Sequence, residues 1–191
     1  MRLNYVSNPP TGLEADDEAI VERIKARRGA KGLIPLDLTL LHAPKVADGC
    51  NALFAAVRTK TSLTDEILEI AICRTCLVLG AWHEWNGHVP KLLASTAFPG
   101  ESGLEIVKAV HLISPGPLNA RQWAALNYAD HMSRAVAVPN DVFEQLGKAG
   151  FSEKEIVELT TLIGAYNMIG RVFVALDIAE ANEKPPQWIA Q

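Results

Sequence analysis

Apolar residues along this chain recur every three to four positions, in segments bounded by helix-capping residues. The run from Glu14 to Arg28 carries an apolar stripe and stops at Gly29, a residue suited to a helix C-terminus. Pro44, tolerated in a first turn, begins a second segment that reaches about Arg58. Thr64 precedes a third, residues 65–79, which has an acidic first turn. The pattern predicts amphipathic helices.

The same signals predict further helices along the rest of the chain. They run from about Ala81 to Ala94 with a bend at Pro90, from Gly103 to Leu112, from Asn119 to about Ala137 and from Pro139 to Lys148. A last segment follows a capping box at Ser152 and Glu155 and is apolar nearly all round from Ile156 to Ile178. Such a helix is typical of the centre of a bundle.

Alternating strand patterns are absent, so we expect an all-α protein. We predict one domain over residues 1–191, with an extended lead at 1–13 and an extended polar tail at 183–191. Apolar residues make up 49% of the chain, at the top of the usual range. One small bundle cannot cover that much apolar surface, so we expect a homo-oligomer.

Charge and composition disfavour several classes of protein. Lys and Arg number 18 against 22 Asp and Glu, and the basic cluster between Lys25 and Lys31 is interpreted as a solvated helix end, so no nucleic-acid partner is expected. No run of about eighteen apolar residues and no signal-peptide core occurs, which favours a cytoplasmic protein without a membrane partner. Three cysteines are too few for a disulfide framework.

The most informative segment is EIAICRTCLVLGAWHEWNGH, from Glu69 to His88. His83, Glu84 and His88 resemble the zinc motif H-E-x-x-H, but the second imidazole lies five residues after the first instead of four. On a regular helix the two imidazoles then point about 140° apart, given about 100° per residue. The spacing disfavours zinc, and we predict no metal site.

Glu84 and His88 are four residues apart and share a helix face. There the carboxylate can orient and charge the imidazole for acid–base work. Trp82 and Trp85 flank the pair and could lower the local dielectric. The alternative is a surface ion pair that contributes a few tenths of a kcal/mol to helix stability. Spacing does not decide between the two interpretations.

Cys73 and Cys76 form a C-x-x-C pair in the middle of an apolar helix. Reactive pairs usually lie at a helix N-terminus, where the helix dipole lowers the thiol pKa, so packing is the favoured interpretation. Arg74 lies within the same apolar stretch and needs a carboxylate partner or an anionic ligand.

Three polar residues, Tyr166, Asn167 and Arg171, interrupt the apolar run of the last helix. Asn167 and Arg171 are four apart and share a face. Buried polar groups need partners, so this face either pairs with Glu69 or Glu158 or lines a pocket.

With these residues in place, the chain resembles the carboxymuconolactone decarboxylase family of the alkyl hydroperoxidase D-like superfamily. The resemblance runs through GLIPLDLTLLHAPKVADGCNAL, EILEIAICRTCLVLGAWHEWNGHVP and VELTTLIGAYNMIGRVFVALDI. It implies the all-helical fold of that superfamily. The peroxidase branch carries a glutamate, eleven residues, a C-x-x-C pair, three residues and a histidine. Counted from Glu69, the thiol positions hold Ala81 and Glu84, and the histidine is His88.

This departure puts thiol peroxidase activity in serious doubt, because Cys73 and Cys76 lie eight residues too early to substitute. The retained Glu69, Glu84 and His88 resemble the decarboxylase branch. That resemblance implies a cofactor-free acid–base site in a homo-oligomer, commonly a trimer or hexamer, and a small-molecule carboxylate as the partner.

The resulting hypothesis is a decarboxylase acting on a small carboxylated lactone or keto acid. His88, oriented by Glu84, exchanges the substrate proton, Glu69 completes the relay, and Arg74 or Arg171 binds a carboxylate or enolate oxygen. Other expected substrate contacts are Trp82, His83, Trp85, Tyr166 and Asn167. Alternatives are an isomerase, a peroxidase that uses Cys73 and Cys76, and a non-catalytic helical oligomer with a pocket closed by Trp82, Trp85 and Phe173.

Overall fold

The computed structural model describes residues 1–189, and the expected all-α class is confirmed: that range contains helices and no strand. The elements are α1 (Ala15–Arg28), η1 (Gly29–Lys31), α2 (Pro35–Leu40), α3 (Pro44–Thr59), α4 (Asp65–Leu79), α5 (Trp82–Ala94), α6 (Gly100–Lys108), α7 (Ala120–Arg134), α8 (Asn140–Lys148), α9 (Glu153–Leu176) and η2 (Ile178–Glu180).

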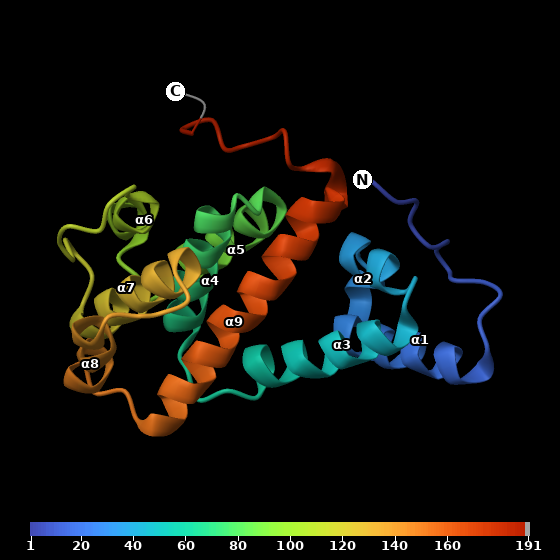
Figure 1. The fold of residues 1–191 in the computed structure, drawn as a ribbon, viewed down its shortest axis with the longest axis horizontal. Coiled ribbons are helices and arrows are strands. Elements are labelled where there is room, and N and C mark those ends of the chain that lie inside the picture. The colour runs from blue at the N-terminus through green and yellow to red at the C-terminus, as the bar shows by residue number, and fades with distance from the viewer. Residues whose placement is uncertain (190–191) are drawn as a thin grey trace.

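Helix α4 lies at the centre of the main hydrophobic core. It packs against α5, α7 and α9 (Figure 1). Every residue from 67 to 76 is buried, which is possible only because neighbours cover the helix on all sides. The helix that carries Glu69 is therefore held rigidly.

A smaller hydrophobic cluster joins α1, α2 and α3 through residues that include Ile20, Ile24, Leu41 and Ala47. These helices lie on one side of α9, and α4 to α8 lie on the other (Figure 1). Helix α3 packs on α1 and also on α9. The end of α3 is thereby brought to the core helices α4 and α9.

Three residues are expected to cap helix N-termini, Thr64, Asn119 and Ser152, and the last two do so. The side chain of Asn119 accepts a hydrogen bond from the Gln122 amide at 2.9 Å, and Ser152 accepts one from the Glu155 amide at 3.3 Å. Thr64 precedes α4 as expected, but its side chain makes no capping bond, because its hydroxyl donates to the Glu66 carboxylate instead.

Several helix boundaries differ from the expected ones. Helix α6 ends at Lys108, before Leu112, and α7 ends at Arg134, before Ala137. Helix α9 ends at Leu176, because Asp177 adopts a left-handed conformation with φ 52°. The short helix α2 was not predicted; Pro35 begins it, and the Asp37 carboxylate accepts the Ile34 amide at its start.

Helix α9 is less enclosed than its sequence suggests. Its length and composition would suffice to cross a membrane, but it packs on α3, α4 and α7 as a core helix. The opposite face is open, with Val157 65% and Met168 40% exposed. The expectation of burial all round is therefore wrong for this chain taken by itself.

The lead and the described part of the tail pack on other parts of the chain. The backbone amide of Arg2 donates to the Leu176 carbonyl at 2.8 Å, which ties the lead to the end of α9. Residues 183–189 form no helix, and the Trp188 ring lies 5.8 Å from that of Trp85. The last two residues of the expected tail, 190 and 191, lie outside the described range.

Candidate active site

The imidazole of His88 is the centre of the candidate site. It is 5% exposed and projects from α5 toward Glu69 on α4. Its Nδ1 lies 2.5 Å from Glu69 Oε2, a short contact between two buried groups. Because the carboxylate can only accept, Nδ1 carries the proton, and the other ring nitrogen, Nε2, is left for chemistry.

Two hydrogen-bond donors face His88 Nε2. The hydroxyl of Tyr166, on α9, and Nη1 of Arg58, near the end of α3, each lie 3.3 Å from it. Arg58 also donates to the Tyr166 oxygen at 2.5 Å and to Glu69 Oε1 at 3.0 Å. Four helices thus contribute to one connected polar network.

Glu84 completes the surroundings of Nε2. Its carboxylate lies one helical turn before His88, with Oε2 3.6 Å from Nε2, longer than a hydrogen bond. The expectation that Glu84 orients the imidazole is corrected, because Glu69 holds the other ring nitrogen at bonding distance. Glu84 instead offers a negative charge at the nitrogen that faces the cavity.

These groups open onto a cavity of about 540 Å³ between α1, α3, α5 and α9. A volume of this order accommodates a small organic molecule. Its lining includes Phe54, Arg58, His83, Glu84, His88, Lys91, Tyr166 and Ile169. The site combines apolar walls with a few convergent polar groups, as ligand sites do.

The surroundings set the charge of each group. Burial by itself would raise the pKa values of Glu69 and Glu84. The contact with His88 outweighs burial at both carboxyls, and Arg58 adds to its effect at Glu69, so both pKa values are lowered. Burial raises the pKa of the Tyr166 phenol, so this hydroxyl stays protonated as a donor. At neutral pH the network holds two carboxylates, a phenol and a guanidinium.

These lowered pKa values predict a loss of stability in acid. A group with a depressed native pKa stabilises the fold above its unfolded pKa, here near 4.5, and loses that contribution as pH falls through the native value. The free energy of unfolding, measured in urea from pH 6 downward, should therefore fall below about pH 4.5. Glu69→Gln should be less stable at pH 7 and show a shallower acid dependence; an unchanged slope would contradict this.

Of the other predicted contacts on α5, His83 alone reaches the cavity. Its ring stacks on Phe173, with centroids 5.3 Å apart and planes 17° apart, and it forms part of the wall. Trp85 is buried against Trp188, and Trp82 faces a different cavity. The expectation that both indoles contact the substrate beside His88 is therefore wrong.

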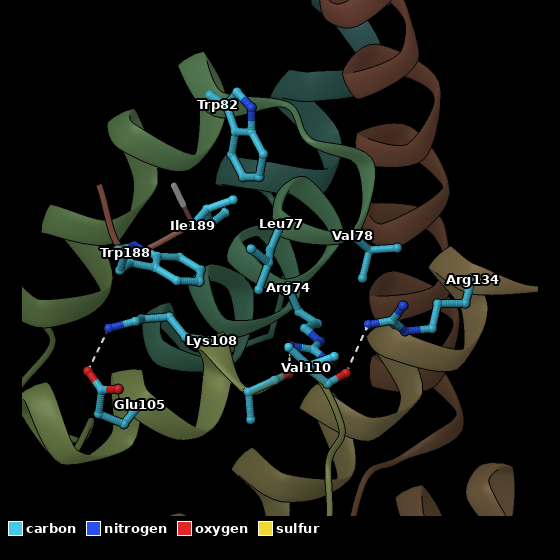
Figure 2. A pocket seen from close by; sticks show the side chains of 11 residues that line it. Arg74, Leu77, Val78, Trp82, Glu105, Lys108, Val110, Arg134, Trp188 and Ile189 are labelled. Carbon is cyan, nitrogen blue, oxygen red and sulfur yellow. Dashed lines mark hydrogen bonds and ion pairs between the residues drawn. The ribbon is translucent and has the colours of Figure 1, made fainter. Parts of the chain in front are cut away.

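Arg74 also lies away from His88, beside a second cavity of about 630 Å³ that Trp82 and Trp188 help to line (Figure 2). It is fully buried; Nε donates to Asp130 at 2.8 Å, and Nη1 donates to the carbonyls of Val107 and Ala109 at 2.7 Å each. The arginine joins α4 to α7 and to the end of α6. Its role in this structure is to hold helices together.

The polar residues Asn167 and Arg171 on α9 likewise make hydrogen bonds away from His88. The side-chain amide of Asn167 donates to Ser133 Oγ, and Arg171 donates to the backbone and side-chain oxygens of Asn167. Neither pairs with Glu69 or Glu158, and neither lines the His88 cavity. Tyr166, their neighbour in sequence, is the one that reaches the site.

Sequence reasoning missed several cationic residues that line the cavity. Arg58 lies at the end of a separate helix with no motif to mark it. The basic cluster at the end of α1 and in η1 was interpreted as solvated, but the structure places Arg27, Arg28 and Lys31 in the cavity wall. The sequence did contain one indication of this cluster, the close spacing of basic residues between Lys25 and Lys31 in a protein of net charge -4.

Cys73 and Cys76 are buried within α4. Burial raises the pKa of both thiols well above the ordinary value, which suppresses the reactive thiolate. Neither thiol lines the His88 cavity. The arrangement agrees with a packing role.

A thiol-specific reagent should accordingly modify the folded protein at Cys50 only, because Cys50 is partly exposed and the other two thiols are not. We expect one equivalent of label in native buffer and three after denaturation. Cys50→Ser should take up no label while folded. Rapid labelling of that variant would show that Cys73 or Cys76 is accessible.

Comparison with protein-family models finds no match, and comparison with curated proteins finds none either. Solved structures do match. A peroxidase-related protein from Ralstonia eutropha JMP134, described as an alkylhydroperoxidase AhpD core, has TM-score 0.73 and 18% identity, over 98% of this chain and 93% of its own. A protein of Agrobacterium tumefaciens described as a putative antioxidant defence protein AhpD has TM-score 0.63 and 24% identity, over 73% and 92%.

An enzyme is also among the matches. The debrominase Bmp8 has TM-score 0.68 and 16% identity, over 87% of this chain and 88% of its own. Likeness at these identities concerns the fold, which is thus compatible with enzymes as well as with proteins of other roles. The chain has the all-helical fold of the alkyl hydroperoxidase D-like superfamily.

Proposed function

We propose that this protein is a cofactor-free acid–base enzyme, a carboxy-lyase that decarboxylates a small carboxylated lactone or keto acid. The observation that carries the proposal is the state of His88. Glu69 holds its Nδ1 at 2.5 Å, and Nε2 faces a cavity beside a phenol, a guanidinium and a second carboxylate. The imidazole is oriented to exchange one proton at one known atom.

The groups suit the steps of a decarboxylation. When the bond between the carboxylate and its neighbouring carbon breaks, carbon dioxide leaves and the electron pair remains as an enolate. Tyr166 and Arg58 can donate hydrogen bonds to the enolate oxygen. His88, protonated at Nε2, then gives this proton to the carbon atom, and Nε2 takes up another proton from solvent. Glu84, 3.6 Å from Nε2, stabilises the imidazole while Nε2 carries this proton.

Two features support an enzyme over an inert binding module. Trp82, Trp85 and Phe173 do not close the cavity, and its polar groups converge on one atom, His88 Nε2.

The assembly is a separate proposal: exposed Val157 and Met168 on α9 support the homo-oligomer expected from the apolar content. A cytoplasmic location remains a prediction.

The test is incubation with a panel of carboxylactones and β-keto acids, without added metal or cofactor, while carbon dioxide release and product structure are followed. Release of carbon dioxide from one member supports the proposal. An isomerised product with no carbon dioxide would assign the site to proton transfer alone, the alternative isomerase. No turnover of any carboxylated compound, with turnover of a hydroperoxide, would overturn the acid–base assignment.

A further inference from the structure

Positively charged side chains gather in the wall of the His88 cavity. Its lining brings together five cationic side chains and one carboxylate, that of Glu84: Arg27, Arg28, Lys31, Arg58 and Lys91. The protein as a whole carries a net charge of -4. A cavity that concentrates cations within an acidic protein attracts anions selectively.

Ion pairing divides these five cations into two groups. Arg28 pairs with Asp37 at 2.7 Å, and Arg58 pairs with Glu69 at 3.0 Å. The remaining three, Arg27, Lys31 and Lys91, form no ion pair with any carboxylate in residues 1–189. The Arg27 guanidinium donates to the neutral side-chain amide of Asn51. We call Arg27, Lys31 and Lys91 the cation triad.

Two members of the triad, Lys91 and Arg27, have lowered pKa values although carboxylates lie near them, Glu69 and Glu84 near Lys91 and Asp37 near Arg27. Burial, followed by the charge of Arg58, lowers the pKa of Lys91. Burial, followed by the charge of Arg28, lowers the pKa of Arg27. A bound anion would favour the charged forms of Lys91 and Arg27.

The triad lies beside the reacting centre but shares no hydrogen bond with the groups around His88. Lys91 lies three residues after His88 on α5, about 4.5 Å further along the helix axis at 1.5 Å per residue. Arg27 and Lys31 come from α1 and η1, which contribute nothing to the hydrogen bonds around His88. A ligand that reaches both places needs two polar ends.

The chemistry indicates which end the triad binds. A carboxylate that leaves as neutral carbon dioxide gains nothing from a strong ion pair, because such a pair stabilises the ground state more than the transition state. The triad therefore suits a non-reacting group. Three cations that make no ion pair match a phosphate dianion better than a single carboxylate, and an arginine fork with two ammonium groups is a common phosphate donor set.

We propose that Arg27, Lys31 and Lys91 bind a non-reacting phosphate group of the substrate, so that the substrate class is a phosphorylated small carboxylic acid. The identification as substrate rests on the proposed function; the phosphate site itself does not. Remote binding of this kind positions the reacting end at His88.

The site can be tested without turnover, by titrating the protein with inorganic phosphate and with acetate in a calorimeter at low salt. Phosphate should bind, and acetate should bind at least about tenfold more weakly, because the dianion engages more of the triad. Lys31→Gln combined with Lys91→Gln should weaken phosphate binding by about tenfold or more. Lys148→Gln on the distant α8 removes one positive charge far from the cavity and should leave phosphate binding unchanged (Figure 1).

The variant His88→Ala separates the two proposals. It should bind phosphate like the parent protein, because His88 is not part of the triad. Equal affinity for phosphate and acetate, or unchanged phosphate binding in the double lysine variant, would overturn the phosphate site even if the protein decarboxylates unphosphorylated acids. Phosphate binding that depends on the triad, with no turnover of any carboxylated compound, would keep the site and reject the lyase.

Discussion

Replacing His88 with alanine should lower kcat/KM by about 10²–10⁴-fold for whichever carboxylated substrate is turned over. The variant removes the one group whose free nitrogen faces the cavity between Tyr166, Arg58 and Glu84. Steady-state kinetics with the first active member of the substrate panel would measure the loss. Because proton transfer belongs to the chemical step, the decrease should appear in kcat.

Controls separate chemistry from folding. His111→Ala removes an exposed imidazole outside the cavity and should leave kcat and the unfolding midpoint unchanged. Glu84→Gln keeps the size of the side chain but removes the charge near Nε2, so it should lower kcat while the protein stays folded. If His88→Ala and Glu84→Gln were folded, assembled and fully active, the acid–base assignment would be wrong.

Replacing Asp130 with asparagine should destabilise the fold by about 3–5 kcal/mol, the largest effect we expect on stability. Within residues 1–189, Asp130 is the only carboxylate paired with Arg74, whose side chain is fully buried. Arg74 Nη2 lies 2.8 Å from the same Asp130 oxygen but lacks hydrogen-bond alignment, so the carboxylate charge compensates it mainly as an ion pair. Urea unfolding monitored by circular dichroism would give the change in free energy.

Arg134 provides the matched control, because it contacts the same Asp130 oxygen but its side chain is 49% exposed. Arg134→Ala should cost less than about 1 kcal/mol, as expected for a solvated ion pair. A double variant, Arg74→Met with Asp130→Leu, should recover much of the lost stability, because no unpaired charge stays buried. Equal losses for Asp130→Asn and Arg134→Ala would contradict the structural role assigned to Arg74.

Much of the helical framework could be predicted from local sequence. Capping residues such as Asn119 and Ser152 act within one turn of the chain, so their effect depends little on tertiary packing. Boundaries such as the end of α6 at Lys108 were less predictable. There the chain leaves the helix, and the carbonyls of Val107 and Ala109 accept hydrogen bonds from Arg74 on another helix.

The site divides in the same way. Glu69, Glu84 and His88 could be found because their spacing within one segment survives without the thiols. Arg58 could not be found, because nothing near it in sequence marks its contact with His88 and Tyr166. The sequence shows that the charge of Arg74, in an apolar stretch, needs a partner, and Arg74 was therefore expected to bind the substrate. The sequence does not show that this partner is Asp130.

The sequence by itself therefore determined the helical class, most helix starts and the absence of cysteines from the two positions between Glu69 and His88. These properties depend on residue type and on separations of a few residues, where helix geometry is known in advance. Only the tertiary structure decided which carboxylate orients His88, which arginine reaches it and where the cation triad meets the cavity. These contacts join helices far apart in the chain, and packing of their apolar faces sets their relative positions.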